Sequence, residues 1–156
     1  MANLQPRVRR TRRGDFELAL PDVERQVLRS LPAQLRELMS TDDPAVERLF
    51  PPAYRDDPDS EAEYRAMVGG ELRNRRLSSL EVMEATIDAT RLDEKQLLAW
   101  LGAINDLRLV LGTRLEVTED IYDQGIPEDD PSSLSLALFF YLGWLEEQVV
   151  QALAAG

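Results

Sequence analysis

The sequence contains no cysteine and no histidine, and it contains a single lysine, Lys95. Without cysteine there is no disulfide, no thiol redox couple and no cysteine-ligated zinc. Without histidine, the side chain that most often moves protons near neutral pH is missing, together with every Ser-His nucleophile pair. Catalysis would have to depend on carboxylates, arginine, tyrosine or Lys95. We therefore expect a protein that is not an enzyme and that has no cofactor.

Long hydrophobic runs are also missing, since no apolar stretch approaches the roughly 20 residues that a membrane span needs. The first residues lack the apolar core of a signal peptide, so we expect a cytoplasmic protein with no membrane contact. Hydrophobic residues make up 44% and charged residues 30% of the 156 positions, as in ordinary globular domains. A single domain over residues 1–156 is the expected organisation.

Positive charge is scarce overall, because the net charge is −11. Such a balance opposes nucleic acid as the default partner. Two acidic stretches, near 53–59 and over 116–131, are predicted to be loops. The first begins like an EF-hand, but Ala62 stands where that motif needs glycine and Val68 where it needs glutamate. We expect solvated loops and no metal site.

Residues 7–20 have the pattern of a β-hairpin. Phe16, Leu18 and Leu20 alternate with other residues, as in a half-buried strand, and Gly14 suits the turn between the strands. The first strand is rich in arginine, which favours either contact with DNA or a protein partner, or a solvated strand that resists aggregation. The candidate contact residues are Arg7, Arg9, Arg10, Arg12 and Arg13.

Residues 21–156 predict a helical body. The first helix is expected to turn Val23 and Val27 toward the core, because they continue a helical apolar pattern. Pro32 is expected to kink this helix or to restart it behind Ser30. The predicted fold class is thus mainly α, a single-domain helical bundle with a short N-terminal β-hairpin.

Capping residues predict where further helices begin. A short helix follows Asp43-Pro44, and Asp93 precedes a longer helix that Gly112 is expected to close. Two pairs with capping-box spacing, Ser60 with Glu63 and Ser78 with Glu81, predict two separate helices. The last helix is expected to start behind Ser132 or Ser133 and to reach about Leu153.

The last helix is apolar nearly all round in its first half. This pattern indicates either the central helix of the bundle or a subunit interface in a homodimer. The candidate self-association face consists of Phe139, Phe140 and Trp144.

The helix that follows Asp93 contains a run of polar residues that could line a pocket. Such residues more often connect a helix to its neighbours through hydrogen bonds and ion pairs. We expect a structural role, with Asp106 or Glu116 paired to Arg108 or Arg114. The residues of this run are Asn105, Asp106, Arg108, Gly112, Thr113 and Arg114.

The order of these elements resembles a known family. The arginine hairpin, the segment 48–54, the run 105–115 and Trp144-Leu145 together are similar to an actinobacterial domain of unknown function, DUF2017. Members of that family are also described as AosR-type oxidative-stress transcriptional regulators. The resemblance implies a protein without enzymatic activity. It also implies a regulatory context, because genes of this family tend to lie beside the gene of the ClpS protease adaptor.

Two hypotheses for function follow from the residues and the resemblance together. The first is a transcription-associated regulator that contacts DNA through the hairpin arginines or contacts a transcription protein. The second is a protein-protein interaction module without DNA contact, linked to regulated proteolysis. A carboxylate-dependent enzyme or a metal-binding protein is the least expected alternative.

Overall fold

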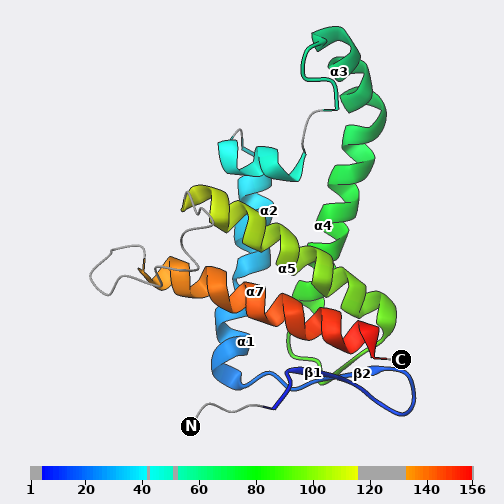
Figure 1. The fold of residues 1–156 in the computed structure, drawn as a ribbon, viewed down its shortest axis with the longest axis vertical. Helices are drawn as coiled ribbons and strands as arrows, with labels where there is room; N and C mark the ends of the chain where they lie inside the picture. The colour runs from blue at the N-terminus through cyan, green and yellow to red at the C-terminus, as the bar shows by residue number, and fades with distance from the viewer. Residues whose placement is uncertain (1–4, 42, 51–52, 116–132, 156) are drawn as a thin grey trace.

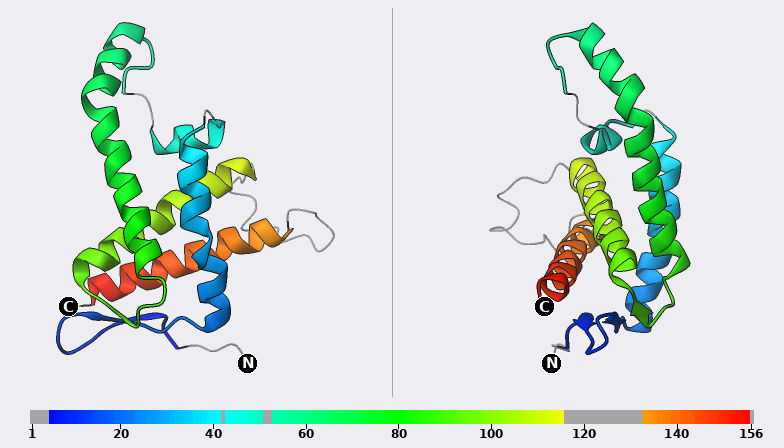
Figure 2. Two further views of the ribbon diagram at one scale, coloured as in Figure 1. Left: turned by 180° about the vertical axis from the view of Figure 1, so that it is seen from behind. Right: turned by 90° about the vertical axis from the view of Figure 1, so that its right-hand side faces the viewer.

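The computed structural model describes residues 5–41, 43–50, 53–115 and 133–155. Over these residues the protein is mainly helical, which confirms the predicted fold class. Two layers of helices cross (Figures 1 and 2): α2 (Leu31–Met39) and α4 (Gly70–Ala85) lie behind α5 (Glu94–Arg114) and α7 (Ser133–Ala154). A small sheet lies at one end, beside α7.

The predicted hairpin is confirmed. Strand β1 (Val8–Arg10) pairs antiparallel with β2 (Phe16–Leu18), and Gly14 adopts a positive φ of 91° in the turn. A third strand, β3 (Arg91–Leu92), pairs with the other edge of β2. The sequence pattern did not predict β3, because two residues are too few to show alternation. This extra pairing and the contact with α7 support a hairpin that is marginal by itself.

The first helical segment breaks before Pro32, as the sequence predicted. Helix α1 (Asp22–Arg29) ends at Ser30, and α2 restarts with Pro32 in its first turn, where a missing N–H removes no helical hydrogen bond. The predicted core face of α1 is wrong, however. Val23 and Val27 are 76% and 44% exposed, while Leu28 is fully buried.

A 3₁₀ helix, η1 (Pro44–Leu49), follows Asp43 as predicted. The second correction concerns the helices after residue 57. Helix α3 (Pro58–Tyr64) then starts behind Asp57, whose carboxylate accepts a hydrogen bond from Ser60 N at 3.2 Å. The Ser60–Glu63 pair therefore does not form the predicted cap.

Helix α3 continues through a π-helical turn, η2 (Arg65–Gly69), into α4. Ser78 and Glu81 lie within α4 and begin no new helix, because Leu80 and Met83 on the same stretch pack into the core. The α3 end of this long helix projects from the body (Figure 1). We call residues 53–69 the arm.

Helix α5 starts at the predicted Asp93, which forms a capping box with Gln96. It continues past Gly112 to Arg114, because Gly112 lies against α7. A Cβ at Gly112 would stand 3.0 Å from Phe139 Cε2. Glycine thus permits close approach of two helices here and does not end one.

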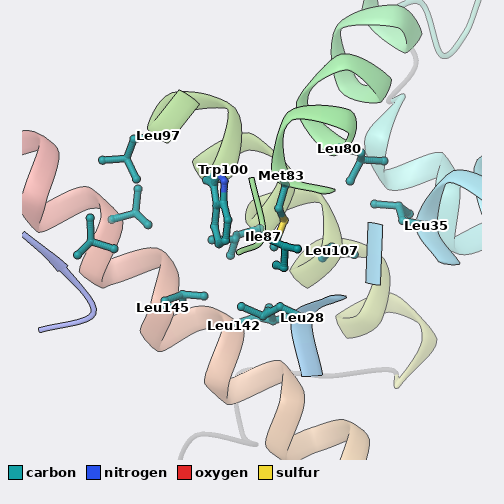
Figure 3. Packing of buried hydrophobic residues seen from close by; sticks show 14 of the residues in the cluster. Leu28, Leu35, Leu80, Met83, Ile87, Leu97, Trp100, Leu107, Leu142 and Leu145 are labelled. Atoms are coloured by element: carbon teal, nitrogen blue, oxygen red, sulfur yellow. The ribbon is translucent and has the colours of Figure 1, made fainter. Parts of the chain in front are cut away.

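The core is built around α5, which packs against α4, α7, α2 and η1. Trp100 lies at its centre (Figure 3), and its Nε1 donates to Thr86 Oγ1 at 2.7 Å. The central helix of the bundle is therefore α5, while α7 covers one side of it. Among the described residues, no helix has the length and apolarity that crossing a membrane requires.

Candidate functional site

Arg7, the first candidate arginine, is only 8% exposed. Its Nε and Nη2 donate to the Glu24 carboxylate of α1 at 3.1 and 2.9 Å, and its guanidinium lies 5.1 Å from the centre of the Trp144 ring. Tyr141 on α7 donates to the same Glu24 at 2.7 Å. The Glu24 hydrogen bond raises the pKa of Arg7, and burial raises the pKa of the Tyr141 phenol. This cluster joins β1, α1 and α7.

Arg10 is also tied to the body. Its Nη2 donates to the Leu153 carbonyl near the end of α7 at 3.1 Å, and its guanidinium lies 4.7 Å from the ring centre of Phe16. Both Arg7 and Arg10 therefore hold the sheet against the helices. Replacing either is expected to weaken the fold, so neither reading of the hairpin arginines, as contact residues or as a solvated strand, describes Arg7 and Arg10.

The other three candidates face solvent. Arg9 pairs with Glu17 across the hairpin at 2.8 Å, and both side chains are exposed, so this ion pair contributes little stability. Arg12 and Arg13 are exposed in the turn. The structure thus divides the hairpin arginines into two that hold the fold and three that present positive charge.

The candidate self-association face divides in a similar way. Phe139 is 6% exposed and packs edge to face against Phe140, which is half-buried. Trp144 is 40% exposed, although one side of its ring contacts the Arg7 guanidinium. Most of this aromatic surface is therefore used within the chain.

The polar run of α5 has different partners from those expected. Asp106 is 2% exposed and pairs with Arg76 of α4, while Arg108 pairs with Glu146 of α7 at 2.6 Å. Burial raises the pKa of Asp106 even though Arg76 opposes this shift. The expected pairing of Asp106 with Arg108 or Arg114 is wrong, because Asp106 and Arg108 face different neighbouring helices. The alternative acid, Glu116, lies outside the described residues.

The remaining members of that run serve packing and helix geometry. Asn105 is half-buried, Arg114 is exposed, and Thr113 donates its hydroxyl to the Leu109 carbonyl at 2.9 Å. Gly112 allows the contact with Phe139 described above. Through Asp106 and Arg108, the run connects α5 to α4 and to α7.

The arm is a surface that sequence reasoning missed. No side chain of α3 or η2 is buried, and α3 packs mainly against η2. Tyr54 is 50% and Met67 is 80% exposed, although both are apolar. The signal in the sequence was Gly69-Gly70 in the middle of a helix, which marks the place where the arm leaves the body.

No group of three or more carboxylates is placed to hold a metal ion within the described ranges. The acidic stretch 116–131 lies outside the described residues. The described residues build a helical protein whose exposed features include the arginines of the hairpin turn and the arm.

Residues 5–153 match the family Domain of unknown function (DUF2017), and the chain belongs to this family. The oxidative stress regulator AosR of Mycobacterium tuberculosis is 33% identical over 129 residues, 71% of this chain and 58% of the relative. A relative in Mycobacterium leprae, also named as an oxidative stress regulator AosR, is 31% identical over 132 residues, 73% of this chain and 60% of its own.

The chain spans about 60% of the length of these curated relatives. No solved structure matches it. The names of the relatives describe regulators, which agrees with the family resemblance noted from the sequence.

Proposed function

We propose that this protein is a non-enzymatic regulator that acts by binding another protein, in the oxidative-stress response that the names of its relatives describe. The 156 residues contain no cysteine, so a thiol switch within them is excluded as the sensing chemistry. The regulatory step in this proposal is macromolecular contact.

The arm is the observation that carries the proposal. The helical part of the arm buries none of its side chains, so packing within the chain stabilises it little. The arm nevertheless exposes Met67 of η2 and Tyr54 of the loop before α3 to water. The arm also carries exposed carboxylates at Asp56, Asp59 and Glu63, and its five acids outnumber its two bases, Arg55 and Arg65. The partner that fits this surface is a protein with an apolar pocket bordered by basic side chains.

The test compares proteins captured from the native cytosol by the wild-type chain and by two variants. Met67→Glu places a charge on the arm, whereas Leu98→Glu places the same charge on α5, where Leu98 is 52% exposed. We expect a basic partner to be retained by wild type and Leu98→Glu and to be lost with Met67→Glu. Identical captured sets for all three proteins would refute the role of the arm.

A second candidate is a regulator that contacts DNA, favoured by the exposed arginines at the hairpin turn. Of the five hairpin arginines, Arg9, Arg12 and Arg13 are exposed and available for phosphates, since Arg7 and Arg10 are held by the body. Three contacts provide a small electrostatic gain against a net charge of −11. This is the reason that we rank protein binding first.

A further inference from the structure

The sulfur atoms of this chain are distributed very unequally between core and surface. The sequence has four methionines and no cysteine, and Met1 lies outside the described residues. Of the other three, Met39 and Met83 are 2% and 0% exposed in the core, whereas Met67 of η2 is 80% exposed. Within the described ranges, Met67 is therefore the one sulfur that an oxidant in solution reaches without unfolding the protein.

Met67 also lies where a change of side-chain polarity costs the fold little. No side chain of α3 or η2 is buried, and this end of the long helix projects from the body in the views of Figures 1 and 2. Oxidation of Met39 or Met83 would instead place a polar oxygen in the core, where it would lack a hydrogen-bond donor. Met67 can thus change its chemistry while the helices keep their packing.

We propose that Met67 is a site of reversible oxidation by peroxides, and that its sulfoxide ends the contact between the arm and its partner. This inference rests on the proposed function of the arm and adds the regulation of that contact. A lone pair of the sulfur attacks the terminal oxygen of a hydroperoxide, so that an S–O bond forms as the O–O bond breaks. The leaving oxygen takes the proton, and the products are a sulfoxide and an alcohol or water. Sulfur is oxidised by two electrons and the peroxide is reduced by two.

The sulfoxide changes what the arm presents to a partner. It converts a flexible apolar side chain into a polar one, without a change of charge. Burial of the S=O group in an apolar pocket is unfavourable, because the group loses water and gains no donor there. Methionine sulfoxide reductases restore the thioether, so the contact can return.

The surroundings of Met67 favour a neutral oxidant over an anionic one. Glu63 and Glu71 lie about one helical turn before and after Met67, and both are exposed. Their negative charges repel anions that approach the sulfur, whereas an uncharged peroxide is not repelled. This is the reason that we assign the reaction to peroxides.

Peptide mapping by mass spectrometry after treatment with tert-butyl hydroperoxide tests the site. In the folded chain, Met67 should gain one oxygen at least about tenfold faster than Met39 and Met83, because of its exposure. In urea the three rates should become similar, since all three sulfurs then reach water. Sulfoxide reductases should remove the oxygen from Met67, and the circular dichroism spectrum should stay unchanged throughout. Equal rates in the folded chain, an oxygen that the reductases leave in place, or loss of helix would overturn the site.

Three variants test the effect on the contact, with the proteins captured by the wild-type chain as the probe. Met67→Leu stays apolar but forms no sulfoxide, and Met67→Gln has a polar, uncharged side chain like that of the sulfoxide. Leu98→Gln is the matched control, because it places the same amide on α5, where Leu98 is 52% exposed. A basic partner should be kept by untreated wild type, by Leu98→Gln, and by Met67→Leu before and after peroxide treatment. It should be lost by Met67→Gln and by oxidised wild type, and regained after treatment with reductases.

Two outcomes of the capture experiment would overturn the regulation. They are a partner that oxidised wild type retains, and a partner that peroxide-treated Met67→Leu loses. The proposed function and this inference fail separately. If Met67→Glu also retains every captured protein, the arm is not the contact and its regulation fails with it. Peptide mapping still decides whether Met67 is the oxidised site, because it needs no partner.

Discussion

At the scale of single residues, Arg25 shows how one cation organises several backbone segments. Its guanidinium donates to the carbonyls of Leu18, Leu20, Ile87 and Ala89 at 2.6 to 3.2 Å. These carbonyls belong to the end of β2, the connection before α1 and the loop before β3. The side chain therefore replaces the hydrogen bonds that regular structure would provide for them.

We predict that Arg25→Ala lowers the free energy of unfolding by about 2–4 kcal/mol, because hydrogen bonds from a charged donor are lost and carbonyls are left without partners. Arg29→Ala, one turn later on α1, is the control. Its ion pair with Asp88 is solvent-exposed, so the expected loss is much smaller than that of Arg25→Ala. Urea denaturation measures both; equal losses would contradict the role given to Arg25.

A second prediction concerns the buried pair between Asp106 and Arg76. Arg76→Met should cost about 3 kcal/mol or more at neutral pH, because it leaves a buried carboxylate without its cation. Asp106→Asn should cost less, since the amide oxygen still accepts from Arg76. The double variant should regain most of the stability that Arg76→Met loses. Chemical denaturation of the three variants measures this cycle, and additive losses would contradict it.

The pH dependence of the same pair has a definite sign. Burial raises the pKa of Asp106 above its ordinary 3.8, so the folded protein holds this proton more tightly than the unfolded chain does. The stability from Asp106 is then fully present below pH 3.8 and is lost as the pH rises through the raised pKa. The stability of wild type minus that of Asp106→Asn should therefore fall from acid to neutral pH. A rise over that interval would show that Arg76 outweighs burial.

At the scale of helices, the contact between α5 and α7 depends on Gly112. Gly112→Ala should destabilise the protein by about 1–3 kcal/mol, because the new Cβ would press on the buried Phe139 ring. Gly102→Ala in the same helix is the matched control, since its Cβ would meet Ser79 Oγ at an ordinary 3.5 Å. There the better helix propensity of alanine should add up to about 1 kcal/mol. Thermal unfolding of both variants distinguishes packing from propensity.

For the whole molecule, the charge distribution limits any binding to DNA. If the three exposed hairpin arginines contact phosphates, the log–log slope of affinity against salt should be no steeper than about −2.7, from −0.9 for each contact. Arg12→Ser with Arg13→Ser should abolish retardation in mobility-shift assays without loss of stability, because both side chains are exposed. A steeper slope, or binding that survives this change, would place the DNA contact elsewhere.

Much of the architecture could be predicted from local patterns. The hairpin around Gly14, the break before Pro32 and the caps at Asp43 and Asp93 were predicted because each depends on neighbouring residues. The Ser78–Glu81 spacing failed as a helix start, because packing of Leu80 and Met83 held one long helix together. Local signals propose helix ends, and burial decides among them.

The sequence by itself determined the fold class, the absence of thiol and imidazole chemistry, and the residues available for contact. Tertiary structure decided what those residues do. Arg7 is held by Glu24 while Arg12 stays free, although both are arginines of one hairpin. Val23 and Val27 have the spacing of core residues, yet they face solvent because Leu28 takes the core position. Whether a side chain is buried depends on which distant segment of the chain packs against it. The spacing of apolar residues along one helix carries no information about that segment.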